Sequence, residues 1–271
     1  MSNANDLKTV KKRKIVIGVS SAVATLLIAI LIALLICGSL WGIPPFGALR
    51  DARLKKLEGN ADRYSVENVQ PLDNSPLDGK RICYLGSSVT YGASSLQTSF
   101  VEYIAKRNKT TFVKEAVSGT TLVDDGNSYV KRLKSIDKNE KFDLFVCQLS
   151  TNDASKKRPL GNVDDQDAKT VCGAINFIID YARQTWNCPV VFYTNAYYES
   201  KQYAQMVAAL NEIARMKDVF VADLYSDNQF NAISDEQRKL YMEDKIHPTK
   251  AGYLEWWTPA IEKTLYKAMG E

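Results

Sequence analysis

The chain begins with one long apolar stretch and continues with short apolar runs that alternate with amphipathic segments. Residues 15–49 contain no charged side chain, and about 20 apolar residues suffice for a helix to cross a bilayer. Further along, several short apolar runs have the length and composition of buried strands. We expect these strands at residues 81–86, 111–117, 143–149, 189–194 and 219–224.

Segments with helical periodicity separate the expected strands. We expect helices at residues 96–107, 128–136, 167–186, 200–216 and 249–269, and a charged helix at residues 48–60. Alternation of apolar strands with helices is typical of a parallel sheet that helices cover on both faces. The pattern therefore predicts an α/β fold, a three-layer αβα sandwich, preceded by an N-terminal transmembrane helix.

The apolar stretch has a basic run in front of it, which bears on its orientation. Positive residues favour the cytoplasmic side, so we expect residues 1–14 to be a basic cytoplasmic tail, residues 15–41 to span the membrane and the rest to lie outside the cytoplasm. Basic residues between 50 and 56 weaken this orientation. A cleavable signal peptide is the alternative, but its apolar region is normally about 7–15 residues, which is shorter than this stretch.

The remaining residues divide into residues 42–79, a linker or strap, and residues 80–271, a single domain. The net charge of +4 is concentrated at the N-terminus, so nothing indicates a nucleic-acid partner. The five cysteines are expected to be free thiols, although a Cys172–Cys188 bridge is conceivable. A lone histidine and scattered cysteines do not make up a zinc site, and we expect no metal and no cofactor.

Four short segments carry candidate chemistry, since ligands bind beyond the carboxyl ends of parallel strands. Three follow strands: the Ser88 turn at residues 86–92, the Gly119 turn at residues 117–121 and the Asn152 turn at residues 150–153. The fourth contains Asp244 and His247, the only histidine, whose imidazole can exchange a proton near neutral pH. Taken singly, each segment is also explained as a capping turn or a structural histidine.

Taken in this order, the four segments resemble the SGNH hydrolase, or GDSL-type esterase/lipase, family. The resemblance covers about residues 80–269 and implies a flavodoxin-like sheet order. It implies that Ser88 is the nucleophile, His247 the general base and Asp244 the residue that orients it. It also implies an oxyanion hole formed by the backbone N–H groups of Ser88 and Gly119 and by the Asn152 amide.

Two positions depart from the family pattern. Ser87 stands where the family has the aspartate before the nucleophile, and Ser150 stands where it has a glycine. Neither removes a group that performs a chemical step, but both put the geometry of the loops in question. A catalytically silent, membrane-tethered domain that binds a glycan or a protein therefore remains an alternative.

The expected activity is that of a serine esterase that removes small acyl groups, acetyl first among them, from an acylated small molecule or an extracytoplasmic glycan. Asn195, Tyr197 and Tyr198 follow a strand at the same end of the sheet, where they either line a substrate pocket or merely pack at its rim. A lipase or thioesterase is the alternative within the enzyme class. The substrate class follows from fold analogy and location, not from any one residue.

Overall fold

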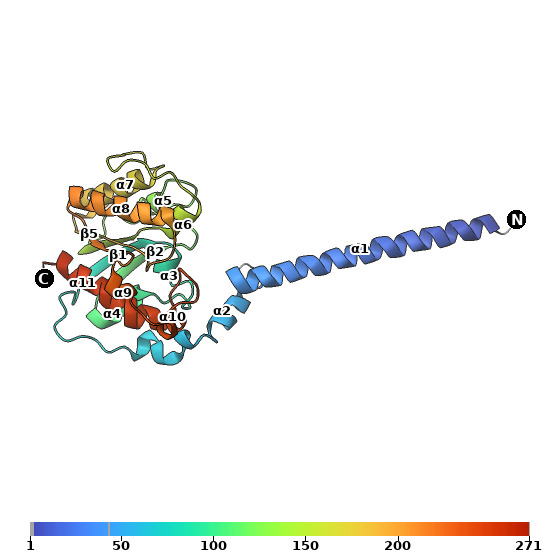
Figure 1. Ribbon diagram of the computed structural model, residues 1–271, viewed down its shortest axis with the longest axis horizontal. Helices are drawn as coiled ribbons and strands as arrows, with labels where there is room; N and C mark the ends of the chain where they lie inside the picture. Colours follow the sequence, from blue (N-terminus) through green and yellow to red (C-terminus); the bar gives the residue numbers. More distant parts are fainter. Residues whose placement is uncertain (1–2, 43, 271) are drawn as a thin grey trace. The chain divides into compact units, whose positions relative to one another are not determined.

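The computed structural model describes residues 3–42 and 44–270, and it divides into one unit that ends at Lys56 and one that begins at Leu57. The first unit contains α1 (Asn3–Trp41) and α2 (Ala48–Leu54) (Figure 1). Within α1, Ala22–Leu40 has a mean hydropathy of 2.8 and is long enough to cross a membrane. Both membrane spans and signal sequences contain such helices, so the predicted orientation and the bounds of the tail and the linker stay predictions.

The second unit contains a fully parallel sheet of five strands. The strands are β1 (Arg81–Gly86), β2 (Thr111–Ala116), β3 (Leu144–Gln148), β4 (Val190–Tyr193) and β5 (Phe220–Ala222). Their order is β2-β1-β3-β4-β5, which is the flavodoxin-like order, so the predicted fold class is confirmed. The order reverses between β1 and β3, and this switch point is where such sheets bind ligands.

Helices cover both faces of the sheet, as Figure 1 shows. One face packs against α5 (Tyr129–Leu133), α7 (Val171–Trp186) and α8 (Lys201–Lys217), and the other against α4 (Phe100–Asn108) and α11 (Thr258–Ala268). Side chains alternate across a strand, so Cys83 and Leu85 of β1 lie in the first core and Ile82 and Tyr84 in the second.

Two predicted helices differ from the observed ones. The segment predicted as one helix at residues 249–269 contains a π-helical stretch, Gly252–Trp257, before α11. Pro259 explains the irregularity, because proline has no N–H to donate to the carbonyl of residue 255. The helix predicted at residues 48–60 ends early, at Leu54. A Cβ at Gly59 would lie 2.0 Å from the carbonyl oxygen of Leu240, so close backbone packing takes the place of a further helical turn.

Residues 57–79 pack on the sheet domain through three short 3₁₀ turns, η1 (Glu58–Asn60), η2 (Asp62–Tyr64) and η3 (Val66–Asn68). Tyr64, Val69 and Leu77 are buried in the core that contains α4 and α11. Four short helices were not predicted: α3 (Ser88–Tyr91), α6 (Thr151–Ser155), α9 (Asn228–Asn231) and α10 (Asp235–Tyr241). The sequence signal for α10 was the capping box formed by Ser234 and Gln237.

Candidate active site

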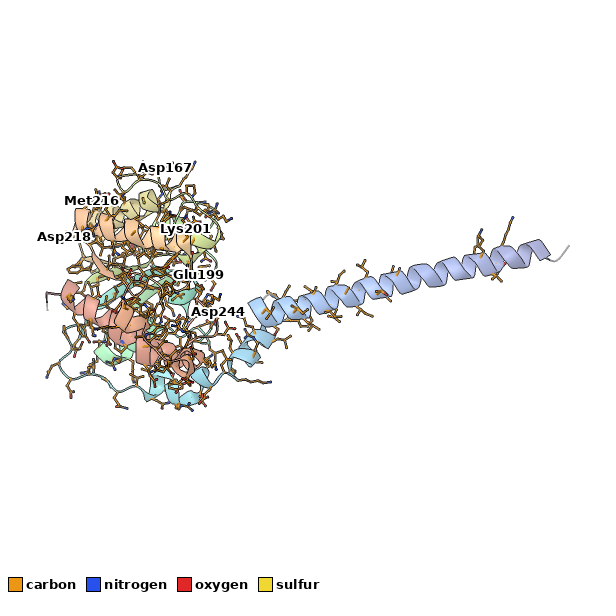
Figure 2. All side chains as sticks on the ribbon, viewed as in Figure 1. Asp167, Glu199, Lys201, Met216, Asp218 and Asp244 are labelled. Carbon is orange, nitrogen blue, oxygen red and sulfur yellow. The ribbon has the colours of Figure 1, made fainter. Side chains whose placement is uncertain are left out.

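The candidate residues gather at the carboxyl ends of the strands. Figure 2 shows Asp244 at the same end of the domain as Glu199 and Lys201, which lie at the start of α8. Met216 and Asp218 lie at the far end of that helix. The chain thus carries its candidate chemistry at one edge of the sheet, as a parallel topology requires.

Ser88 lies in a sharp turn from strand to helix. β1 ends at Gly86, and Ser88 is the first residue of α3. A Cβ at Gly86 would lie 1.7 Å from Oγ1 of Thr90, so only glycine permits this close return of the chain. The backbone N–H of Ser88 has no acceptor within the helix, because it belongs to the first turn. It is therefore available to a ligand.

A continuous chain of hydrogen bonds joins Ser88, His247 and Asp244. The Oγ of Ser88 lies 2.8 Å from Nε2 of His247, and Oδ2 of Asp244 lies 2.8 Å from Nδ1 of the same ring. Oδ1 of Asp244 also accepts hydrogen bonds from the backbone N–H groups of Ile246, at 2.7 Å, and His247, at 2.8 Å. These contacts fix the carboxylate relative to the ring.

Two opposing influences act on the pKa of Asp244. Partial burial disfavours the charged carboxylate, but the hydrogen bonds and the His247 ring outweigh it and lower the pKa to about 2. The carboxylate is therefore ionised at neutral pH. An ionised carboxylate on Nδ1 keeps the proton on that nitrogen and leaves Nε2 free to accept the serine proton. This arrangement is able to activate a hydroxyl nucleophile.

Asn152 lies on α6 and lines the same cavity as Ser88, which is described below. One N–H of its side-chain amide donates to the carbonyl oxygen of Thr120 at 2.9 Å, which leaves the second N–H for a ligand. Ser150, the departure from the family glycine, is the N-cap of α6. Its hydroxyl oxygen accepts a hydrogen bond from the backbone N–H of Asn152 at 3.1 Å. Its φ of −72° is open to any residue, so the substitution imposes no strain.

Gly119 lies in the exposed loop after β2 with a φ of +79°, a conformation that favours glycine. Its carbonyl oxygen accepts a hydrogen bond from Nζ of Lys156 at 2.8 Å. Lys156 follows α6, so this contact holds the glycine loop beside the helix that carries Asn152. The role of the Gly119 N–H in the oxyanion hole stays a prediction.

Asp153 is fully buried behind this loop. Its carboxylate accepts hydrogen bonds from the backbone N–H groups of Leu122, at 2.7 Å, and Val123, at 3.3 Å. Burial raises its pKa to about 6, although these hydrogen bonds and Ser150 act in the opposite direction. Asp153 thus connects α6 to the chain that follows Gly119.

Two further residues support the site, and no sequence pattern pointed to either. The buried side chain of Arg132 donates hydrogen bonds of 2.9 Å to the carbonyl oxygen of Gly86 and to Oγ1 of Thr120. Gln148, at the end of β3, accepts a hydrogen bond of 2.9 Å from the N–H of Ser87. Ser87, the departure from the family aspartate, is thereby a buried part of the turn and not a solvent-exposed group.

A cavity of about 360 Å³ opens beside the Ser88 hydroxyl. Most of the residues that line it carry a polar group, although apolar atoms make up most of the lining surface: Ser88, Thr151, Asn152, Ala154, Ser155, Tyr198, Glu199, Ser200, Lys245, Ile246 and His247. Of the three residues predicted for substrate binding, Tyr198 lines this cavity and Tyr197 a neighbouring one. Asn195 lines neither, because it is buried and its N–H donates to the Tyr203 hydroxyl at 2.8 Å.

Glu243, Asp244 and His247 offer potential metal-ligand atoms within 4.8 Å of one another. Both ring nitrogens of His247 already lie 2.8 Å from protein oxygens. A metal ion on this ring would therefore displace either Ser88 or Asp244. The donor set is better suited to proton transfer than to holding a cation.

The sequence matches the GDSL-like lipase/acylhydrolase family over residues 84–254. Among curated proteins, none matches it. A protein of known structure from Lactobacillus plantarum is 21% identical, with a TM-score of 0.59, over 71% of this chain and 97% of its own. A possible lipase from Chitinophaga pinensis is 17% identical, with a TM-score of 0.55, over 71% of this chain and 99% of its own.

A member of the lipolytic protein G-D-S-L family from Veillonella parvula is 16% identical, with a TM-score of 0.53, over 68% of this chain and 96% of its own. At these identities the solved structures show the fold alone. The family match covers more than half of the chain and includes the turns of Ser88, Gly119 and Asn152 as well as Asp244 and His247. The chain therefore belongs to the GDSL-like lipase/acylhydrolase family and is a serine hydrolase that acts on esters.

Proposed function

We propose that the protein hydrolyses short-chain acyl esters, acetyl esters first among them, with Ser88 as nucleophile. The observation that carries the proposal is the 2.8 Å approach of the Ser88 hydroxyl to Nε2 of His247, with Asp244 on the opposite nitrogen. Two groups that are far apart in the sequence meet in the geometry that hydroxyl activation needs.

His247 takes the proton of Ser88 as the hydroxyl oxygen attacks the ester carbonyl, and Asp244 stabilises the imidazolium that forms. The backbone N–H groups of Ser88 and Gly119 and the free amide N–H of Asn152 stabilise the negative charge on the carbonyl oxygen. His247 then gives its proton to the departing alcohol. Water attacks the acyl-enzyme by the same route and releases the acid.

The lining of the 360 Å³ cavity supports a short acyl group. Apart from Ala154, Ile246 and Tyr198, its side chains are hydroxyl, amide, charged or imidazole groups. A long alkyl chain would have to desolvate these groups without satisfying their hydrogen bonds, which is costly. An acetyl group leaves most of them in contact with water, and on this ground we propose an acetylesterase in preference to a lipase.

The proposed location of the substrate is inferred from the N-terminal helix. Ala22–Leu40 is apolar enough to span a membrane, and a basic run precedes it. We propose a single-pass anchor with the N-terminus in the cytoplasm and the hydrolase domain outside it. Acylated glycans of the cell envelope are the esters that a domain so placed encounters, and they are the proposed substrates.

The test uses the full chain in detergent micelles. A fluorophosphonate probe should label the protein, and Ser88→Ala should abolish the label. Nitrophenyl acetate should be hydrolysed faster than nitrophenyl octanoate. Faster turnover of octanoate would favour a lipase. A folded protein that neither takes the label nor hydrolyses any ester would contradict the proposed activity and favour a binding domain.

A further inference from the structure

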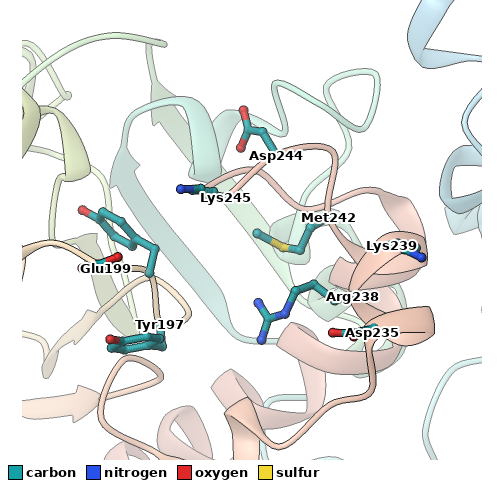
Figure 3. Close-up of a pocket in the computed structure, with 9 residues that line it drawn as sticks. Tyr197, Glu199, Asp235, Arg238, Lys239, Met242, Asp244 and Lys245 are labelled. Atoms are coloured by element: carbon teal, nitrogen blue, oxygen red, sulfur yellow. The ribbon is translucent and has the colours of Figure 1, made fainter.

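A second, larger cavity adjoins the one at Ser88. Its volume is about 610 Å³, and it is lined by Tyr197, Tyr198, Glu199, Asp235, Arg238, Lys239, Met242, Asp244 and Lys245 (Figure 3). The two cavities share Tyr198, Glu199 and Lys245. A ligand that fills both would therefore pass directly over the reactive hydroxyl.

The position of His247 decides which half of an ester enters which cavity. The departing alcohol must receive its proton from Nε2 of His247, so it leaves on the histidine side of Ser88. His247, Ser88 and Asn152 all line the smaller cavity, so the ester bond is cleaved there. The larger cavity adjoins it through Lys245 and is also lined by Asp244, which contacts the His247 ring. We therefore place the acyl group in the smaller cavity and let the alcohol extend past His247 into the larger one.

The larger cavity carries an aromatic surface at one side. Tyr197 is 52% exposed, and its ring packs against Tyr225 with the centroids 5.2 Å apart. Its backbone N–H donates to Oδ1 of Asn231 at 2.9 Å, which fixes the main chain beneath the ring. An exposed ring that is held from behind offers a flat apolar face to a ligand.

Charged groups of both signs face this aromatic surface. Figure 3 shows Arg238 extending from α10 toward Tyr197, with Asp235 on the same helix and Glu199 on the opposite wall. Within the described residues, none of these three side chains forms an ion pair with another side chain. The cavity therefore presents hydrogen-bond donors and acceptors that are not committed to each other.

We propose that this larger cavity is the subsite for the alcohol half of the ester and that this alcohol is a sugar. The inference rests on the proposed ester hydrolysis at Ser88. A sugar ring has an apolar C–H face, which stacks on Tyr197, and hydroxyl groups at its edge. Those hydroxyls accept hydrogen bonds from Arg238 and donate them to Asp235 and Glu199. An alkyl chain would offer these three charged groups no hydrogen bonds in place of those they make to water.

The reaction that follows from this placement is balanced. The bond between Ser88 Oγ and the acyl carbon forms as the bond between that carbon and the sugar oxygen breaks. The serine proton passes through His247 to the sugar oxygen, and the free sugar leaves the larger cavity. Water then hydrolyses the acyl-enzyme, and this second step is the same whichever alcohol has departed.

The test compares acetylated sugars with methyl acetate, whose alcohol is too small to reach Tyr197 or Arg238. The full chain in detergent is assayed with acetylated glucose, acetylated N-acetylglucosamine and acetylated galacturonate. We expect kcat/KM for at least one sugar to exceed that for methyl acetate. In Arg238→Ala and in Tyr197→Ala this preference should fall about tenfold, which corresponds to the loss of one hydrogen bond to a charged group or one ring contact.

Two matched variants separate binding from a structural effect. Tyr197→Phe retains the aromatic face and should keep most of the preference. Arg215→Ala removes an exposed cation of α8 that lines neither cavity and should leave the preference unchanged. The rate of deacylation, measured as kcat where it limits turnover, should be the same in every variant, because the sugar has already departed.

Several outcomes would overturn the inference. One is a wild-type protein that prefers methyl acetate to every sugar ester. Another is an equal fall in kcat/KM for sugars and methyl acetate in Arg238→Ala, which would indicate a structural role. A shift in acyl chain-length preference in place of sugar preference would assign the larger cavity to the acyl group. No turnover of any ester would instead reject the proposed function, and this inference with it.

Discussion

The guanidinium of Arg132 donates a hydrogen bond of 2.9 Å to the carbonyl oxygen of Gly86, the last residue of the strand that leads to Ser88. The same nitrogen donates to Oγ1 of Thr120 at 2.9 Å, and the other terminal nitrogen donates to the carbonyl oxygen of Glu115 at 2.9 Å. One buried cation therefore connects the nucleophile turn with the glycine loop. Its rigid fork of donors matches acceptors on both sides.

Arg132→Lys should lower kcat for ester hydrolysis about tenfold while the protein stays folded, because a single ammonium replaces the planar fork and at least one charged hydrogen bond is lost. The measurement is kcat for nitrophenyl acetate together with the free energy of unfolding. Arg183→Lys is the matched control. Arg183 also donates to two carbonyl oxygens, those of Lys217 and Asp218, but Asp218 lies at the far end of α8 (Figure 2). Equal loss of activity in both variants would contradict a positioning role for Arg132.

Asn152→Ala should lower kcat by about a hundredfold or more, since removing one oxyanion donor costs about 2.7–4 kcal/mol of transition-state stabilisation. The KM should change much less, because the donor acts on charge that develops during the reaction. Steady-state kinetics on nitrophenyl acetate measure both constants. Asn211→Ala is the control, since the Asn211 amide donates to Oδ2 of Asp223 at 2.7 Å and lines neither cavity. A change confined to KM would remove Asn152 from the oxyanion hole.

Ser88→Ala and His247→Ala should each abolish nearly all turnover, and the double variant should be no worse than either single one. The two residues act as one unit joined by the 2.8 Å contact, so the second substitution has nothing left to remove. The measurement is the ratio of the turnover rate of each variant to the uncatalysed rate. Circular dichroism establishes that each variant is folded. Losses that multiply would show that the two side chains act independently.

The stability of the wild-type protein relative to Asp153→Asn should depend on pH. Burial raises the pKa of Asp153 from 3.8 in the unfolded chain to about 6, so between these values the folded state binds more protons. The stability that the protonated Asp153 carboxyl contributes is thus fully present below about pH 4, and it is lost as the pH rises through about 6. The loss is about 3 kcal/mol at 1.36 kcal/mol per pKa unit.

Chemical denaturation at pH values from about 4 to 7 measures this difference. The low pKa of Asp244 affects stability only at lower pH. Its contribution is the same in the wild type and in Asp153→Asn, so it cancels in the difference between their free energies of unfolding. The free energy of unfolding of Asp153→Asn should therefore increase relative to that of the wild type as the pH rises. Parallel stability curves would mean that the Asp153 carboxylate is ionised throughout this range.

Much of the fold was predictable because it depends on local patterns. The five strands were expected at nearly the residues where they occur, since a buried parallel strand is a continuous apolar run that is visible in the sequence. The errors fall where contacts distant in sequence override the local pattern. Gly59 meets the Leu240 carbonyl and ends the expected helix early, and Pro259 produces the π-helical stretch before α11.

The sequence by itself determined which groups are available for chemistry: one histidine, a carboxylate three residues before it, and small polar turns after successive strands. Only the tertiary structure decided that Ser88 and His247, which are 159 residues apart, lie within 2.8 Å, that Arg132 supports the turn, and that α10 forms the wall of a second cavity. The reason is physical. Residue types fix the acids, bases and donors, but distances between them arise only when the hydrophobic faces of the helices pack onto one sheet.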